Sequence, residues 1–167
     1  MTDAIDSLDA RLLRVLAETP RAGVMEIARQ LDVARGTAQA RLDKLRQRGV
    51  ITGFGPDIDL RRLGYEVMAF ITLEIRQGAL HEVVDYLRTI PQVLEIHATT
   101  GNGDLLVRVV AGTNADLHPL ITRIHAGGGI ERSTTQIALT EQLPLRVQQL
   151  VDLAIGEDPD PTPATDD

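Results

Sequence analysis

The chain has 167 residues, of which 43% are hydrophobic and 25% are charged. These proportions are typical of a globular protein with a buried core and exclude disorder of the whole chain. The absence of cysteine excludes disulfides, thiolate metal sites and cysteine nucleophiles. The first twenty residues carry four acidic side chains, and no apolar run in the chain is long enough for a bilayer. We therefore expect a cytoplasmic protein without a signal peptide or membrane span.

The formal net charge of −7 is distributed unevenly along the chain. Residues 11–53 contain nine basic and four acidic side chains, whereas the remainder is strongly acidic. This asymmetry is typical of proteins in which one end binds nucleic acid, although an arginine-rich surface without a partner is the alternative. The chain has two tyrosines, two phenylalanines and no tryptophan, so it lacks the stacking platforms of single-strand binders. Duplex DNA is therefore the expected partner.

The N-terminal segment, residues 1–53, has the pattern of a winged helix-turn-helix domain. Apolar residues recur at helical spacing from residue 6 or 7 to 18, from 24 to 30 and from 35 to 48. Thr19-Pro20 ends the first of these helices, and Gly49 ends the third. A tight turn separates the second helix from the third, which is typical of a helix-turn-helix. Residues 50–54 are predicted to form a strand, the wing of the domain.

The second part of the chain has a different pattern. Turn-forming residues fill 54–64, which we interpret as a linker. Beyond it, the predicted order is β-α-β-β-α-β, typical of a ferredoxin-like sheet with one uncovered face. The predicted strands are 67–75, 93–100, 105–111 and 130–139, and the predicted helices are 80–88 and 117–124. The fold class is therefore α+β.

The C-terminal segment is predicted to be an amphipathic helix over residues 144–155, followed by a disordered acidic tail at 156–167. We assign this helix to the same domain as the sheet, so that the second domain spans residues 65–155. The helix and the uncovered sheet face offer more apolar surface than a small domain needs. We therefore expect a homo-oligomer, either a dimer or a tetramer or octamer assembled from dimers.

Four segments carry a resemblance to a known family. They are Leu8–Leu13, Glu26–Ala28, Arg41–Ile51 and the glycine-rich turn Thr100–Leu106. With the order of the two modules, they resemble the Lrp/AsnC family of feast/famine transcriptional regulators. The resemblance covers residues 6–151 and implies a DNA-binding domain followed by an effector-binding and oligomerisation domain. The sequence departs from the family at Ala34, where a serine usually caps the recognition helix.

The third predicted helix carries the candidate DNA-binding residues. Ala38, Leu42 and Leu45 form its apolar side, which leaves its other faces free to enter a major groove. Arginine reads guanine, whereas threonine and glutamine contact phosphate or adenine. Arg46 and Arg48, at the end of the helix, are expected to contact phosphate or to make no DNA contact. The complete predicted set is Arg35, Thr37, Gln39, Arg41, Lys44 and Arg48. A solvated charged helix face is the alternative interpretation.

The turn between residues 100 and 104 is the candidate effector site. The Asp104 carboxylate can pair with the ammonium group of an amino acid, while amides near Thr100 and Gly101 bind its carboxylate. The resemblance implies that Gln136 and Ala138 shape the side-chain pocket. The expected effector is therefore an amino acid or a related small molecule. The alternative is that Asp104 only completes a hairpin turn.

Two other functions compete with an effector-responsive regulator. One is an architectural DNA-binding protein without an effector. The other is an enzyme that resembles siroheme decarboxylases, which have a similar two-module architecture. In that case His97 of this chain, on a predicted strand, could serve porphyrin chemistry. The sequence has no serine nucleophile motif, no histidine spacing typical of metal ligands and no phosphate-binding loop. We therefore expect a protein that is not an enzyme and has neither cofactor nor metal.

Overall fold

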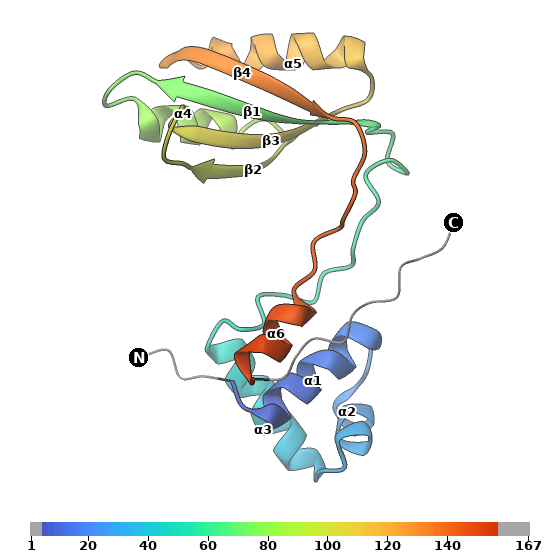
Figure 1. Cartoon of the computed structure of the whole chain (residues 1–167). Helices are drawn as coiled ribbons and strands as arrows, with labels where there is room; N and C mark the ends of the chain where they lie inside the picture. Colours follow the sequence, from blue (N-terminus) through green and yellow to red (C-terminus); the bar gives the residue numbers. More distant parts are fainter. Residues whose placement is uncertain (1–4, 157–167) are drawn as a thin grey trace. The chain divides into compact units, whose positions relative to one another are not determined.

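Two compact units make up the computed structural model, which describes residues 5–156. The helical unit contains residues 5–56 and 144–156, and the sheet unit contains residues 57–143. Figure 1 labels the helices and strands of both units. Within residues 5–156, every helix is too short or too polar to span a lipid bilayer.

The helical unit begins with α1 (Ser7–Glu18), α2 (Val24–Leu31) and α3 (Arg35–Gln47). A capping box starts α1, because the Asp6 side chain accepts from the Asp9 N–H and the Asp9 side chain accepts from the Asp6 N–H. Asp32, at φ 54°, makes the turn that ends α2. Ala34 precedes α3 and makes no side-chain capping bond. The three predicted helices are confirmed.

The core of the helical unit is formed by one apolar side of each of its first three helices. Buried members include Leu12 of α1, Ile27 and Leu31 of α2, and Ala38 and Leu45 of α3. These positions are the apolar ones that the helical spacing predicts. Burying side chains of this size from three elements stabilises their mutual packing by the hydrophobic effect. The opposite side of α3 is left in contact with solvent.

The predicted wing strand at residues 50–54 is absent from the described structure. Gly49, at φ 69°, ends α3, and the N–H groups of Val50 and Ile51 both donate to the Leu45 carbonyl. Ile51 packs against the helical core, whereas Phe54 is exposed. The apolar run predicts a strand, but a strand needs a neighbour for its ladder, and the amides of Val50 and Ile51 bond back onto α3 instead.

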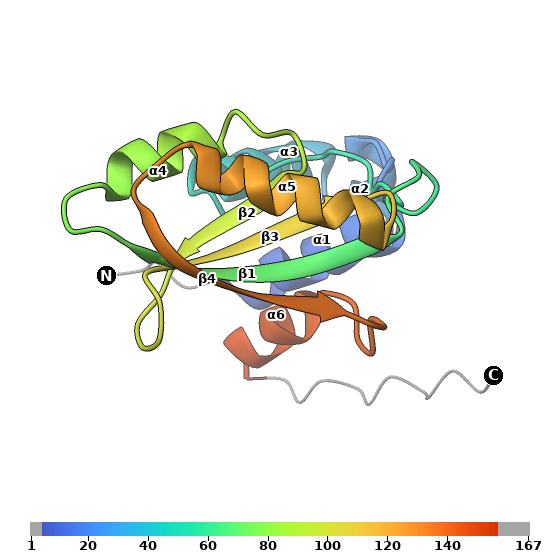
Figure 2. The ribbon, with the colours of Figure 1, turned by 90° about the horizontal axis from the view of Figure 1, so that it is seen from above.

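The sheet unit contains four antiparallel strands in the order β2-β3-β1-β4. The strands are β1 (Val67–Ile75), β2 (Val93–Ala98), β3 (Leu105–Ala111) and β4 (Ile130–Ala138), and the helices are α4 (Leu80–Leu87) and α5 (Asn114–Ala126). The predicted ferredoxin-like order and α+β class are confirmed. Figure 2 shows α4 and α5 lying over the same face of the sheet. Ile71 and Val107 from the strands and Ile124 from α5 are completely buried between these layers.

The other face of the sheet has no helix of the sheet unit packed on it, and we call it the open face. Strand register places Arg108 and Gln136 on either side of Phe70, and Val110 and Ala138 on either side of Met68. Residues directly opposite each other across antiparallel strands share a face. The open face therefore has an apolar centre that contains one arginine, Arg108.

The C-terminal helix differs from the sequence-based assignment. Helix α6 (Gln148–Ala154) is shorter than predicted and belongs to the helical unit, not to the domain of the sheet. The Nε and Nη2 atoms of Arg14 in α1 donate to Asp152 Oδ1 at 3.0 and 2.9 Å. Helical periodicity predicts an amphipathic helix but cannot say which unit supplies its partner surface. The predicted tail lies almost entirely in 157–167, outside the described residues.

Candidate DNA-binding and effector sites

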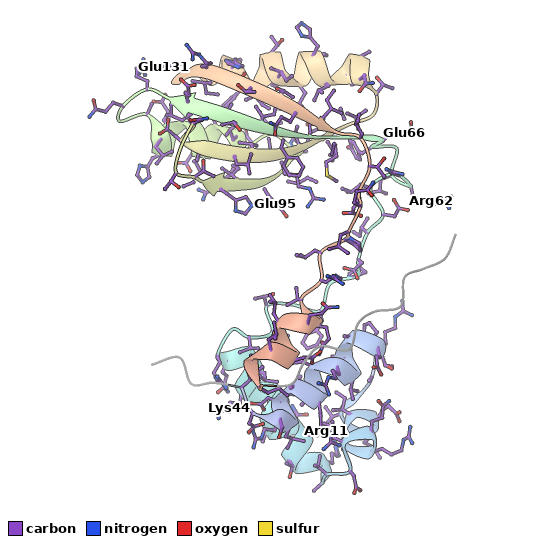
Figure 3. The ribbon with its side chains drawn as sticks, in the orientation of Figure 1. Arg11, Lys44, Arg62, Glu66, Glu95 and Glu131 are labelled. Atoms are coloured by element: carbon purple, nitrogen blue, oxygen red, sulfur yellow. The ribbon has the colours of Figure 1, made fainter. Side chains whose placement is uncertain are left out.

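The exposed side of α3 carries four of the six residues predicted to bind DNA. Arg35, Thr37, Gln39 and Lys44 are all exposed, and the Gln39 amide donates to Asp43 Oδ2 at 2.9 Å. Figure 3 shows Lys44 among the side chains of the helical unit. Because Ala38 and Leu45 anchor the opposite side in the core, the exposed side projects from a fixed support. Polar side chains on the exposed faces of a helix that is anchored in a core suit entry into a major groove.

Arg41 lies elsewhere on α3, directed toward the start of α1. Its Nη1 atom forms ion pairs with Asp6 and with Asp9 Oδ1, the latter at 3.1 Å. Asp9 is only 1% exposed. The Asp9 N–H, together with the Arg41 guanidinium, holds the pKa of Asp6 below its ordinary value. The position predicted to read a base thus has its guanidinium engaged by two carboxylates of its own chain.

Arg48 also approaches Asp9 and is not on the exposed side of α3. Its Nη1 atom lies 4.0 Å from Asp9 Oδ2. That Nη1 atom is buried and has no hydrogen-bond partner among the described residues. Arg41 and Arg48 therefore flank one buried carboxylate and link α3 to α1. Sequence spacing missed this role because periodicity along α3 does not identify which carboxylates of α1 will face it.

The turn predicted to bind an effector is held tightly against β1. The Asp104 N–H donates to the Leu73 carbonyl at 2.8 Å, and Asp104 Oδ2 accepts from the Ile75 N–H at 2.7 Å. A Cβ atom added at Gly103 would lie 2.3 Å from Thr72 Cγ2 and 3.2 Å from the Leu73 carbonyl oxygen, so a larger residue there would force Thr72 to move. Gly101 has φ 104°, a conformation that favours glycine. One oxygen of the proposed ammonium-binding carboxylate is thus already used by the backbone.

The remaining predicted effector residues, Gln136 and Ala138, lie on β4 and belong to the open face. Gln136 pairs with Phe70, and Ala138 pairs with Met68. A groove of about 970 Å³ crosses this face, and Ala138 lines it with Phe70, Arg108 and other residues, whereas Thr100, Gly101 and Asp104 do not. A single chain therefore does not bring all five predicted residues into one pocket.

Sequence reasoning missed Arg108 as a candidate functional residue. Its Nε atom is buried without a hydrogen-bond partner in the part of the chain that the structure describes, and its Nη1 atom lies 3.4 Å from Glu95 Oε1. His97, the residue considered for porphyrin chemistry, lies on the other side of that carboxylate, with 3.6 Å between His97 Nε2 and Glu95 Oε2. Figure 3 shows Glu95 on the sheet unit. The sequence signal that could have indicated Arg108 is its position as a single arginine inside the apolar run Leu105–Ala111.

Comparison with known proteins identifies the two units. The profile of the AsnC-type helix-turn-helix domain matches residues 5–46, and that of the Lrp/AsnC ligand binding domain matches residues 68–146. The regulatory protein AsnC of Haemophilus influenzae is 36% identical over 137 residues, which cover 81% of this chain and 91% of that protein. The chain belongs to the Lrp/AsnC family. It is therefore a DNA-binding transcriptional regulator with a domain for a small-molecule effector, as the resemblance implied.

Solved structures of Lrp/AsnC proteins share its fold. E. coli AsnC is 29% identical, with a TM-score of 0.78 over 86% of this chain and 98% of that one. A Neisseria meningitidis transcriptional regulator, solved in complex with L-methionine, is 22% identical, with a TM-score of 0.77 over 84% of this chain and 93% of that one. Among residues 5–156 of the present protein, no cluster of acidic or histidine side chains could hold a metal ion.

Proposed function

We propose that this Lrp/AsnC protein reads duplex DNA through the exposed side of α3. The observation that carries this proposal is the division of α3 into an anchored side and an exposed polar side. Arg35 and Thr37 lie in the first turns of α3 and Gln39 follows them, the part of a recognition helix that contacts base edges. Arg41 and Arg48 approach Asp9 of α1, so we propose no base contacts for them.

Arg35→Ala tests the assignment. We expect about a tenfold loss of affinity for a duplex selected in vitro by the wild-type protein, because a base-reading arginine contributes about 1–3 kcal/mol. Affinity for random-sequence duplex should fall less. The measurement is fluorescence anisotropy at fixed salt. Arg62→Ala is the matched control, since Arg62 is an exposed arginine of the sheet unit whose side chain is 90% accessible. Equal effects of the two substitutions would contradict the assignment.

We further propose that the protein acts in the cytoplasm as an oligomer assembled through the open face of the sheet. That face has an apolar centre, and its Arg108 has a buried Nε atom for which the described chain provides no acceptor. A second copy that covers the face would remove Met68 and Phe70 from water, and it could supply the missing acceptor. A dimer would also place two α3 helices for the two half-sites of an operator.

The proposed effector is an amino acid or a related molecule, bound near the turn at residues 100–104. Its support is the ligand-binding domain assignment and the bound methionine of the Neisseria relative. Because Asp104 Oδ2 already accepts the Ile75 N–H, an ammonium group would use the remaining carboxylate oxygen or replace that bond. The same contact favours the alternative of an architectural protein, in which Asp104 only secures the turn.

Asp104→Asn separates these two functions. If Asp104 binds an effector ammonium group, we expect the substitution to weaken amino-acid binding by about 1.5–3 kcal/mol, the contribution of a charge-assisted hydrogen bond. Calorimetric titration with L-methionine and the other proteinogenic amino acids, on wild type and variant, measures this. DNA affinity without amino acid should not change. If wild type binds no amino acid, or both proteins bind equally, Asp104 has only its structural role.

A further inference from the structure

Phe54 is a large apolar side chain left on the surface of the helical unit. It is one of two phenylalanines in the protein, and it is 53% exposed. It follows the end of α3 in a segment without regular structure. Ile51, three residues earlier, packs against the helical core, but Phe54 is not among the residues that do so. Its position therefore contributes little to core packing.

The partner of Phe54 is Arg46, in the last turn of α3. The Arg46 Cζ atom lies 5.7 Å from the centroid of the Phe54 ring, within the range of a cation–π contact. Arg46 differs in this respect from Arg41 and Arg48, whose guanidinium groups approach Asp9. Arg46 is exposed, and no carboxylate of the described residues forms an ion pair with it. Its charge is therefore available to an outside anion.

A ring over the face of a guanidinium orients it without using its hydrogen-bond donors. The N–H groups of arginine lie at the edge of the planar group, where they can donate to two oxygens of a phosphate. A free arginine loses side-chain entropy when it binds, and prior stacking reduces that loss. The end of a recognition helix lies near the DNA backbone in helix-turn-helix complexes, whereas its start contacts bases.

We propose that Phe54 is a positioning residue that holds Arg46 for contact with a phosphate of bound DNA. This inference rests on the proposed DNA-binding role of α3. Phe54 acts through Arg46 and does not itself contact DNA. The contact is independent of base identity, so it contributes to affinity for all duplexes alike. The segment after α3 therefore has a DNA-binding function although it forms no wing strand.

The test is a double-mutant cycle on DNA binding by the full-length protein. The variants are Phe54→Leu, Arg46→Ala and the double substitution, with Phe54→Tyr as the conservative replacement. Affinities for the selected duplex and for random-sequence duplex are measured from low to high salt. We expect Phe54→Leu to weaken both complexes about two- to fivefold, the size of an exposed cation–π contact, with little change in salt slope. Phe54→Tyr should bind like wild type.

Arg46→Ala should weaken binding further and should lower the salt slope by about one released counterion. In the Arg46→Ala background, Phe54→Leu should have no additional effect. An equal loss in both backgrounds, or no loss in either, would overturn the proposal. A change in sedimentation coefficient for Phe54→Leu would also overturn it, because Phe54 would then act in self-association. If Arg35→Ala reduces affinity while Arg46→Ala does not, only this inference fails and the proposed use of α3 remains.

Discussion

Arg41→Ala should destabilise the folded protein by about 2 kcal/mol without relaxing its DNA sequence preference. Removing one partner of a buried ion pair costs several kcal/mol because the other charge is left without compensation. Asp9 is buried, but Arg41 and Asp6 are partly accessible to water, which reduces the loss. Urea unfolding followed by circular dichroism measures this change at pH 7. Affinity for the selected duplex is measured at a temperature where the variant is folded.

The acid dependence of stability should change in the same variant. The pKa of Asp6 lies below its ordinary value of 3.8 in the folded protein, so the unfolded chain binds the proton more readily. The wild-type free energy of unfolding should therefore decrease as pH falls below about 4. Arg41 is one cause of the lowered pKa, after the Asp9 N–H, and its removal should make this decrease shallower.

Arg35→Ala provides the matched comparison for Arg41→Ala, since both replace an arginine of α3. Arg35 is exposed, so its loss should leave stability within about 0.5 kcal/mol of wild type while reducing DNA affinity. Arg35→Ala should thus reduce DNA affinity but not stability, whereas Arg41→Ala should reduce stability but not sequence preference. If Arg41→Ala kept full stability and bound all duplexes alike, Arg41 would be a base-reading residue, as the sequence alone suggested.

If two copies associate through the open face as proposed, Phe70→Lys should make the protein monomeric. Phe70 lies between Arg108 and Gln136 on the open face, so the new ammonium group would be placed beside an existing guanidinium. Burying it in an interface between two copies would require removing a charge from water next to a like charge. We expect the dimer dissociation constant to rise on the order of 100-fold or more, since such repulsion costs several kcal/mol. Sedimentation velocity at micromolar concentration measures it.

Phe70→Lys should also lower the affinity for DNA, because it separates the two copies. If a dimer engages two half-sites, the monomer loses the advantage of the second, intramolecular contact, which amounts to about 100-fold or more. The control is Leu80→Lys on α4, in the helical layer that covers the opposite face of the sheet, where Leu80 is 38% exposed. The control should remain oligomeric. Dissociation by both variants, or by neither, would contradict self-association through the open face.

The helices and strands of both units could be predicted because their signals are local. Apolar residues recur every three or four positions in α1 and α3, and β-rich runs bounded by glycine mark β1 and β3. The predicted and observed bounds of β1 and β3 are the same. Helix α5 is longer than its apolar stripe indicated, because Thr113 and Asp116 form a capping box that begins the helix at Asn114.

The roles of individual charged residues were decided by contacts between distant parts of the chain. Arg41 lies 35 residues from Asp6, and Arg14 lies 138 residues from Asp152. Periodicity places each of them on a helix face but does not identify the carboxylate that will face it. Asp104 is similar, since its acceptor role toward the Ile75 N–H depends on the close approach of its turn to β1. Sequence reasoning therefore assigned Arg41 and Asp104 to outside partners.

The sequence by itself determined the two-module organisation, the order of elements in the sheet and the family of this protein. Local hydrophobic period and turn chemistry are sufficient for these, because each element carries its own pattern. Only the tertiary structure decided that α6 joins the helical unit, that residues 50–54 form no strand and that Arg41 faces Asp9. In each case the outcome depends on which partner surface is within reach, and that information arises only when the chain has packed.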